Sequence, residues 1–300
     1  MHLLKARWLY VWLVPTFVLL AVFSYWPPLL SLITAFYHDT GGNGVGSRYF
    51  VGLANFRAIF SDPTFYLALE HIAILTFVPL LLSLFVNILI AELLFNMKSH
   101  WWAGLYRFLI MVPMVTPAIV GTLIWSFFYS PINGLLNILL GDLGLGRYEH
   151  TWLANNHYAL PALLFMGIPF LWGLGALIVL AGLQGVPDSV FEAAALDGAT
   201  SWRRIRRIDL PLVAGQIRLL IILGIIGGLQ NFFQPLIMTQ GGPNNATMVP
   251  GLMMYQWAFE SGSGIPQYGL ATAMGILLFV GILGLTLGLN RLVRNHGENV

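Results

Sequence analysis

The stretch FEAAALDGATSWRRIRRIDLPLV, residues 191–213, differs in composition from the rest of the chain. It holds four arginines within five positions and three acidic residues, whereas the whole chain is 58% hydrophobic and only 9% charged. Because soluble domains carry about 25% charged residues, this composition indicates a membrane protein. Each arginine at the centre of a membrane helix costs about 2.5–3.5 kcal/mol, so we expect the stretch to lie outside the hydrocarbon core.

The composition also excludes several kinds of site. The chain has no cysteine, which removes disulfides, thiolate metal sites and cysteine nucleophiles. Its seven histidines do not form His-Glu-x-x-His or a similar metal-binding spacing, and it has no paired carboxylates or nucleophile motif. The formal charge of +2 is small and the basic residues are dispersed, which argues against a nucleic-acid partner. We therefore predict a protein that is not an enzyme and binds no metal.

Six uncharged intervals are long enough to cross a bilayer, which needs roughly 20 apolar residues per helix. They run over residues 8–37, between His71 and Glu92, between Arg107 and Tyr129, from about Ala159 to Leu183, after Arg218, and up to Arg291. The first is too long for a signal-peptide core and is interpreted as an uncleaved anchor helix. The sequence therefore predicts an all-α membrane protein, a single domain over residues 1–300 with six transmembrane helices and core helices over about residues 66–293.

The basic residues give the expected orientation, because lysine and arginine favour cytoplasmic loops. With the N-terminus in the cytoplasm, 11 of the 14 lysines and arginines fall on that side. Only Arg48, Arg57 and Arg147 fall outside. We expect both termini to be cytoplasmic, together with the loop 184–214 between the fourth and fifth helices.

The charged stretch is expected to form a hairpin of two short helices. Ser189 and Glu192 have the spacing of a capping box, and Gly198 supplies a left-handed residue that ends the first helix. Thr200 then caps a second helix, which Leu210-Pro211 ends. Two interpretations follow: a solvated loop whose arginines hold anionic lipid, or a surface on which another protein docks. The small alanines and the two-helix plan favour docking.

Residues 192–213, EAAALDGATSWRRIRRIDLPLV, resemble the EAA loop of binding-protein-dependent ABC transporter permeases. MTQGGPNNATMVPGLMMYQWAF, residues 238–259, is similar to a segment of carbohydrate permeases of the maltose-transporter large-subunit type. YRFLIMVPMVTPAIVGTLIWSFFYSPINGLLN (106–137) and VGLANFRAIFSDPTFYLAL (51–69) resemble the same group. The chain departs from the pattern at Ile205, where an aromatic residue is common, and at Asp209, where a small or polar residue is usual.

The resemblance implies a type I ABC importer permease fold with a cytoplasmic coupling helix between helices 4 and 5. It implies that the protein lies in a bacterial or archaeal cytoplasmic membrane, where it pairs with a second homologous permease. Two ATPase subunits, which carry ATP and Mg, would dock below, and an extracytoplasmic solute-binding protein above. Lys5 and Lys98 are the only lysines and neither follows a glycine, so this chain has no phosphate-binding loop of its own.

The residues expected to couple to the ATPase share the EAA motif and its continuation: Glu192, Ala193, Ala194, Asp197, Gly198 and Arg203. For Glu192, a contact with the ATPase and a role as the capping-box partner stay equally open. By the same resemblance, Gly241, Gly242 and Pro243 shape the periplasmic mouth.

The substrate pathway is expected in the fifth helix, where Gln230 and Gln234 are four residues apart and share a face, with Asn231 and Phe233 beside them. Amides bond to hydroxyls and rings pack on sugar faces, which suits a carbohydrate; the alternative is hydrogen bonding between helices. Glycerol phosphate or a polyol is a second substrate class. A secondary transporter is less favoured, because Glu70 and Glu92, the acidic residues of the spans, lie at span ends.

Overall fold

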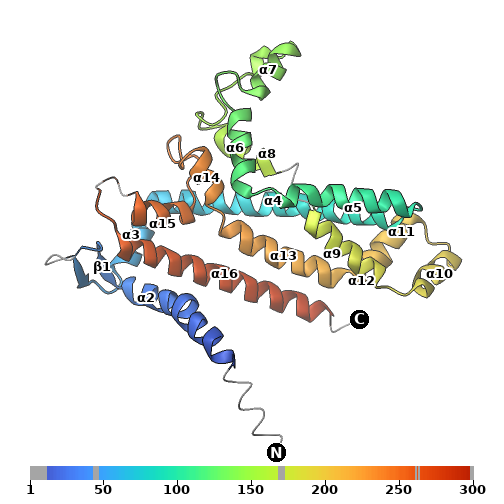
Figure 1. Cartoon of the computed structure of the whole chain (residues 1–300), viewed down its shortest axis with the longest axis horizontal. Coiled ribbons are helices and arrows are strands. Elements are labelled where there is room, and N and C mark those ends of the chain that lie inside the picture. The colour runs from blue at the N-terminus through green and yellow to red at the C-terminus, as the bar shows by residue number, and fades with distance from the viewer. Residues whose placement is uncertain (1–11, 43–46, 168–172, 261, 263, 298–300) are drawn as a thin grey trace, which may run out of the picture. The chain divides into compact units, whose positions relative to one another are not determined.

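The chain is mostly helical and divides into two compact units (Figure 1). The computed structural model describes residues 12–42, 47–167, 173–260, 262 and 264–297. One unit comprises residues 1–65 and 253–280, and the other comprises residues 66–252 and 281–300. The single transmembrane domain over the whole chain stays a prediction.

The smaller unit begins with the expected apolar helix, which runs over Trp12–Thr34 and includes η1 (Leu20–Tyr25) and α2 (Trp26–Thr34). Of the anchor predicted over residues 8–37, residues 8–11 lie outside the described part, and the helix ends at Thr34 instead of residue 37. A short antiparallel hairpin follows, β1 (Tyr37–Asp39) with β2 (Arg48–Phe50), and then α3 (Ala54–Ser61).

The β-hairpin departs from the all-α prediction, and its cross-strand side chains explain it. The rings of Tyr37 and Phe50 meet edge to face at 5.4 Å, and Arg48 pairs with Asp39 at 3.4 Å. Such pairs stabilise adjacent strands by about 0.2–1 kcal/mol each. The three-residue strands are too short to show a period-2 pattern in the sequence.

The larger unit holds the remaining helices, three of which are shared with the smaller unit. They are α4 (Pro63–Phe95), α5 (His100–Val115), α6 (Ala118–Phe128), α7 (Leu135–Asp142), η2 (Gly146–Tyr148), α8 (Ala159–Gly167), α9 (Gly173–Gln184), α10 (Asp188–Leu196), α11 (Ser201–Arg204), η3 (Ile205–Asp209), α12 (Leu210–Leu212), α13 (Ala214–Leu229) and α14 (Phe233–Met238). The shared helices are α4, α15 (Pro250–Phe259) and α16 (Tyr268–Gly297).

Within the described residues, four helices are long and apolar enough to cross a membrane, or up to six if each of two bent pairs is one span. The bent pairs are α5 with α6, at 84°, and α9 with α10, at 76°. The first bend lies at Thr116-Pro117, where proline disfavours the α conformation of the residue before it. The predicted number of six spans and the cytoplasmic termini stay predictions.

Glycines let α13 approach α4 closely. A methyl group at Gly228 would lie 2.6 Å from Thr76 Cγ2, and one at Gly224 would lie 2.5 Å from Leu80 Cδ1. The spacing of four residues puts both glycines on one face of α13. In a membrane, where lipid is as apolar as leucine, this close contact of small residues is a main source of helix association.

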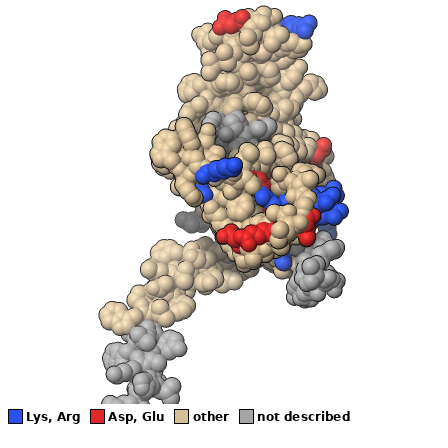
Figure 2. Space-filling model, turned by 90° about the vertical axis from the view of Figure 1, so that its right-hand side faces the viewer, with Lys and Arg blue, Asp and Glu red and all other residues tan. Residues whose placement is uncertain are grey.

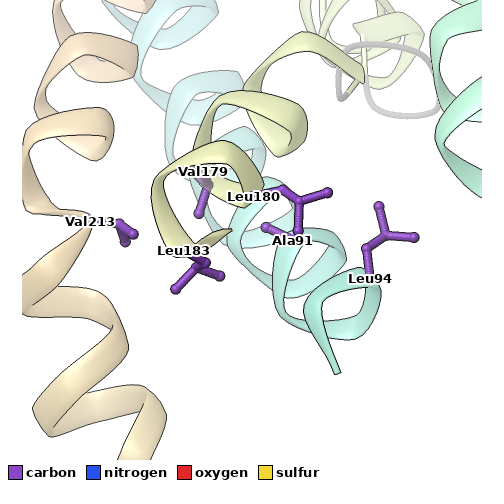
Figure 3. Close-up of a cluster of buried hydrophobic side chains, with 6 residues drawn as sticks. All are labelled: Ala91, Leu94, Val179, Leu180, Leu183 and Val213. Atoms are coloured by element: carbon purple, nitrogen blue, oxygen red, sulfur yellow. The ribbon is translucent and has the colours of Figure 1, made fainter. Parts of the chain in front are cut away.

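An apolar cluster holds the end of α4 against the end of α9 (Figure 3). Its buried members are Ala91, Leu94, Val179, Leu180, Leu183 and Val213. Val213 lies between α12 and α13, so the cluster sits where the charged stretch rejoins the membrane helices. This apolar cluster therefore packs the membrane helices together next to the charged stretch, which contains the candidate site.

Candidate functional site

The charged hairpin consists of α10, α11, η3 and α12, and its turn follows the prediction for Gly198. That residue has φ 68°, and its N–H donates to Ala195 O at 3.1 Å. The next N–H, of Ala199, donates to Ala194 O at 3.0 Å. These two bonds form a Schellman motif, which satisfies the last carbonyls of α10 and requires a left-handed residue.

The predicted capping box is wrong. The structure places Pro187 at the N-cap of α10, so Ser189 lies inside the first turn, and no side chain caps the helix. Asp188 begins the helix, where its carboxylate interacts favourably with the positive end of the helix dipole. Glu192 is therefore free of the capping role.

The second half of the charged hairpin does not end at Leu210-Pro211. Thr200 is the N-cap of α11, as predicted, although its hydroxyl makes no capping bond. The chain then forms the π-helical turn η3 and the short α12, which carries Pro211. Proline lacks an N–H and its ring clashes with the carbonyl four residues earlier; a π-turn, which bonds five residues back, relieves both conflicts. The helical path therefore continues to Leu212.

Most of the predicted coupling residues lie on the surface of the charged hairpin. Glu192, Ala193, Asp197, Gly198 and Arg203 are exposed, whereas Ala194 is buried. Two large apolar side chains that the sequence analysis did not select are also exposed: Leu196 at 90% and Trp202 at 71%. Figure 2 looks onto this end of the molecule and shows acidic and basic side chains gathered on a mostly uncharged surface.

The sequence analysis missed the ionic contacts at the base of the charged hairpin, which we call its ionic root or the Arg204 cluster: Arg204, Asp209, Glu92 and Asn96. Arg204 Nε donates to Asp209 Oδ2 at 3.0 Å, and its Nη2 donates to Asn96 Oδ1 at 2.7 Å and lies 3.7 Å from Glu92 Oε2. The side chain of Asp209 is fully buried and that of Glu92 is 8% exposed. Asn96 also donates to the Glu92 carbonyl at 2.7 Å. Arg204, Asp209, Glu92 and Asn96 therefore join the hairpin to the end of α4.

A cavity of about 970 Å³ lies among α4, α6, α9 and α13. Its wall is mainly apolar, and its polar side chains are Ser83, Thr76, Asn87, Thr116, Thr122, Asn231 and Gln234. Thr76 Oγ1 and Asn87 Oδ1 are buried and have no hydrogen-bond partner among the residues that the structure describes. The rings of Trp125 and Phe233 also line the cavity. Such a wall can hold an uncharged molecule with hydroxyl groups.

The expectation that Gln230 and Gln234 share a helix face is wrong, because α13 ends at Leu229 and α14 begins at Phe233. Pro235 explains the interruption, since its ring conflicts with a helical carbonyl at Asn231. Gln230 is exposed and does not line the cavity, whereas Asn231, Phe233 and Gln234 do. Gln234 Nε2 donates to Leu163 O of α8 at 2.7 Å, which matches the alternative of hydrogen bonding between helices.

The glycine-proline loop, residues 239–249, contains the three predicted mouth residues. Gly241 has φ 86° and the Gly242-Pro243 peptide is cis. Thr247 is fully buried; its hydroxyl donates to Gly242 O at 3.0 Å and lies 2.6 Å from Thr239 Oγ1. With Thr239, Pro243 and Gly242 the loop borders a second cavity of about 670 Å³. The two threonines were not selected from the sequence.

Within the described part of the chain, no three metal-ligating side chains lie together. The prediction that the chain binds no metal or cofactor stays a prediction.

Comparison with known proteins gives a consistent result. The profile of the family described as "Binding-protein-dependent transport system inner membrane component" matches residues 83–295. The chain is 34% identical to the diacetylchitobiose uptake system permease protein NgcF of Streptomyces coelicolor over 81% of this chain and 70% of the relative. It is 31% identical to the multiple sugar-binding transport system permease protein MsmF of Streptococcus mutans over 94% and 93%.

Among solved structures, the chain is similar to a chain of a bacterial ABC transporter involved in the import of the acidic polysaccharide alginate. The TM-score is 0.82 with 24% identity, over 97% of this chain and 96% of that chain. A second structure of the alginate transporter contains a periplasmic protein bound to an alginate pentasaccharide, and its similarity values are the same. At this identity, the match shows the fold.

Proposed function

Because the chain belongs to the family of binding-protein-dependent transport system inner membrane components, we propose that it is one permease subunit of an ATP-driven sugar importer. The chain is a non-catalytic transmembrane component of the importer. We place it in a bacterial or archaeal cytoplasmic membrane with both termini in the cytoplasm. A second homologous permease completes the pathway, and ATP with Mg binds to separate ATPase subunits.

The exposed surface of the charged hairpin carries this proposal. Leu196 and Trp202 are large apolar side chains that stay exposed at 90% and 71%, and they lie among charged residues. Exposed apolar side chains rimmed by polar ones are typical of a surface that binds another protein. We assign Glu192, Ala193, Asp197 and Arg203 to contacts with the ATPase, Gly198 to the turn, and buried Ala194 to packing within this chain.

The cavity supports a neutral, hydroxyl-rich substrate. None of the described lining residues is charged, so the cavity offers no cation to a phosphate and no carboxylate to a coupling ion. This favours a sugar or polyol over glycerol phosphate, and an ATP-driven importer over an ion-coupled one. Asn231, Phe233 and Gln234 are the proposed pathway residues of α13 and α14, and Gly241, Gly242 and Pro243 shape the mouth toward a solute-binding protein.

Purification of the intact complex tests the proposal. The tagged chain is extracted in mild detergent from the cells that produce it, and ATP hydrolysis is measured with its solute-binding protein and one candidate ligand at a time. The ligands are diacetylchitobiose, an alginate oligosaccharide and glycerol 3-phosphate. We expect two ATPase subunits to copurify and a saccharide to stimulate hydrolysis. A chain that brings down no ATPase would overturn the function, and stimulation by glycerol 3-phosphate alone would overturn the substrate class.

A further inference from the structure

We propose that Arg204 is a positioning residue that fastens the charged hairpin to the last turns of α4, so that displacement of the hairpin displaces α4. The proposal rests on the proposed function, in which an ATPase moves the hairpin. It adds the route by which that motion reaches the cavity wall.

The Arg204 guanidinium contacts the charged hairpin and the end of α4 at the same time. Its Nε bonds to Asp209 within the hairpin at 3.0 Å, and its Nη2 bonds to Asn96 on the α4 side at 2.7 Å. The rigid, planar fork of arginine keeps these two bonds at a fixed angle, which a flexible lysine ammonium does not. Any sliding of the hairpin along α4 must therefore break at least one charge-assisted bond.

Burial makes the connection costly to break. The Asp209 side chain is fully buried, and the Glu92 side chain is 8% exposed. Separation of Arg204 from Asp209 would leave a buried carboxylate without a cation, which is strongly unfavourable. The Arg204 cluster therefore differs from the exposed arginines of the same segment, which make no such contacts in the described residues.

Aromatic rings bring the first hairpin helix into the same contact. The Arg204 guanidinium lies 6.0 Å from the ring centre of Phe95 and 5.7 Å from that of Phe191. These two rings lie 5.2 Å apart. Phe95 ends α4 and Phe191 belongs to α10, so one side chain contacts α4 and both arms of the hairpin.

From the cluster, α4 leads directly to the cavity. Asn87, which lines the cavity, precedes Glu92 by five residues, or about 8 Å along the helix axis. Ser83 and Thr76 continue the lining along the same helix. A rigid link at Glu92 and Asn96 therefore transfers hairpin motion to a wall of the pathway.

A pair of spin labels tests the link in the purified complex. The chain has no native cysteine, so Ser189→Cys on α10, away from the side chains assigned to the ATPase contact, and Phe85→Cys on α4 label it selectively; both native side chains are exposed. The label distance is measured without nucleotide and with ATP and vanadate. With Arg204 present, we expect one narrow distance distribution that is the same in both states. In Arg204→Ala we expect a broader distribution whose mean shifts with nucleotide.

Three variants complete the experiment. Arg204→Lys keeps the charge but not the fork and should fall between the parent and Arg204→Ala. Arg206→Ala removes an exposed arginine and should behave like the parent. Because Arg204→Ala strands buried Asp209 and can prevent folding, Arg204→Leu/Asp209→Leu removes both charges and should show the same nucleotide-dependent shift as Arg204→Ala.

The ATPase separates the two proposals. We expect the Arg204 variants to keep the bound ATPase and its hydrolysis rate, which a general loss of structure would not allow. If the parent chain brings down no ATPase, the proposed function itself fails. If the ATPase is bound and the label distance in the folded Arg204 variants matches the parent in both states, the positioning role of Arg204 is overturned.

Discussion

Gly198 and Gly241 have the same kind of backbone conformation in opposite surroundings. Their φ angles are 68° and 86°. A methyl group at Gly198 would meet no atom within 4 Å, whereas one at Gly241 would lie 2.6 Å from Met248 Cε and 3.2 Å from Leu252 Cδ2. The turn of the charged hairpin is thus open to a partner, and the glycine-proline loop is packed against its own chain.

The charged hairpin and the glycine-proline loop also differ in their polar groups: those of the hairpin mostly face outward, whereas those of the loop bond within the chain. The hairpin keeps its charges on the surface except at its ionic root, where Arg204 meets Asp209. The loop is held by neutral groups, chiefly the hydroxyls of Thr239 and Thr247. We infer that the hairpin is built for contact with another protein and the loop for a fixed shape.

The largest expected effect is that of Gly241→Ala. The left-handed conformation costs an alanine about 1–2 kcal/mol, and forcing a methyl group against Met248 and Leu252 costs about 1–3 kcal/mol more. Both neighbours are buried and have little room to move. Thermal unfolding in detergent, followed by tryptophan fluorescence, should show a clear loss of stability. A Tm equal to that of Gly198→Ala would refute the contrast between the two turns.

Thr247→Val comes next and tests the neutral network of the loop. Valine fills the same volume but loses the bonds to Gly242 O and Thr239 Oγ1, which should cost about 1–3 kcal/mol in all, because each hydrogen bond contributes about 0.5–1.5 kcal/mol and both partners are half-buried. The matched control is Thr200→Val in the hairpin, where the exposed hydroxyl makes no capping bond. We expect almost no change in Tm for the control, and equal losses in both variants would contradict the comparison.

Gly198→Ala should cost about 1–2 kcal/mol, all of it from backbone strain, since nothing crowds the new methyl group. Gly198→Asn should recover part of the loss, because asparagine tolerates the left-handed region. Under the proposed function, Gly198→Ala also weakens copurification of the ATPase, while insertion into the membrane is unchanged. A variant that binds the ATPase as the parent does would remove the turn from the docking surface.

Several features of the site were predictable because they depend on local chemistry. Composition indicated the membrane; the placement of the charged stretch outside it, argued from the cost of buried arginines, stays a prediction. The Gly198 turn followed from the EAAALDG sequence and the conformational freedom of glycine. Each of these inferences uses residues within a few positions of one another.

The features that were missed depend on residues far apart in the chain or on competing local signals. Arg204 is 108 residues from Asn96, so nothing local distinguishes it from Arg203 or Arg206. Pro187 took the N-cap position that the Ser189 spacing suggested two residues later, and Pro235 interrupted the helix that would have placed Gln230 beside Gln234. In both cases the proline constraint outweighed the spacing pattern.

The smallest expected effect is that of Arg206→Ala. This variant compares an exposed arginine of the charged hairpin with Arg204, which is paired with buried Asp209. Arg206 is exposed, so its loss should change the free energy of unfolding in neutral detergent by less than about 0.5 kcal/mol. In nanodiscs with anionic lipid, the same variant should lose about 1 kcal/mol of lipid binding, because a basic residue near the membrane gains about that much from anionic head groups. Binding of anionic lipid and Tm in detergent are the two measurements. Unchanged lipid binding would show that Arg206 does not contact anionic lipid. A large loss of Tm in detergent would mean that Arg206 belongs to the ionic contacts around Arg204.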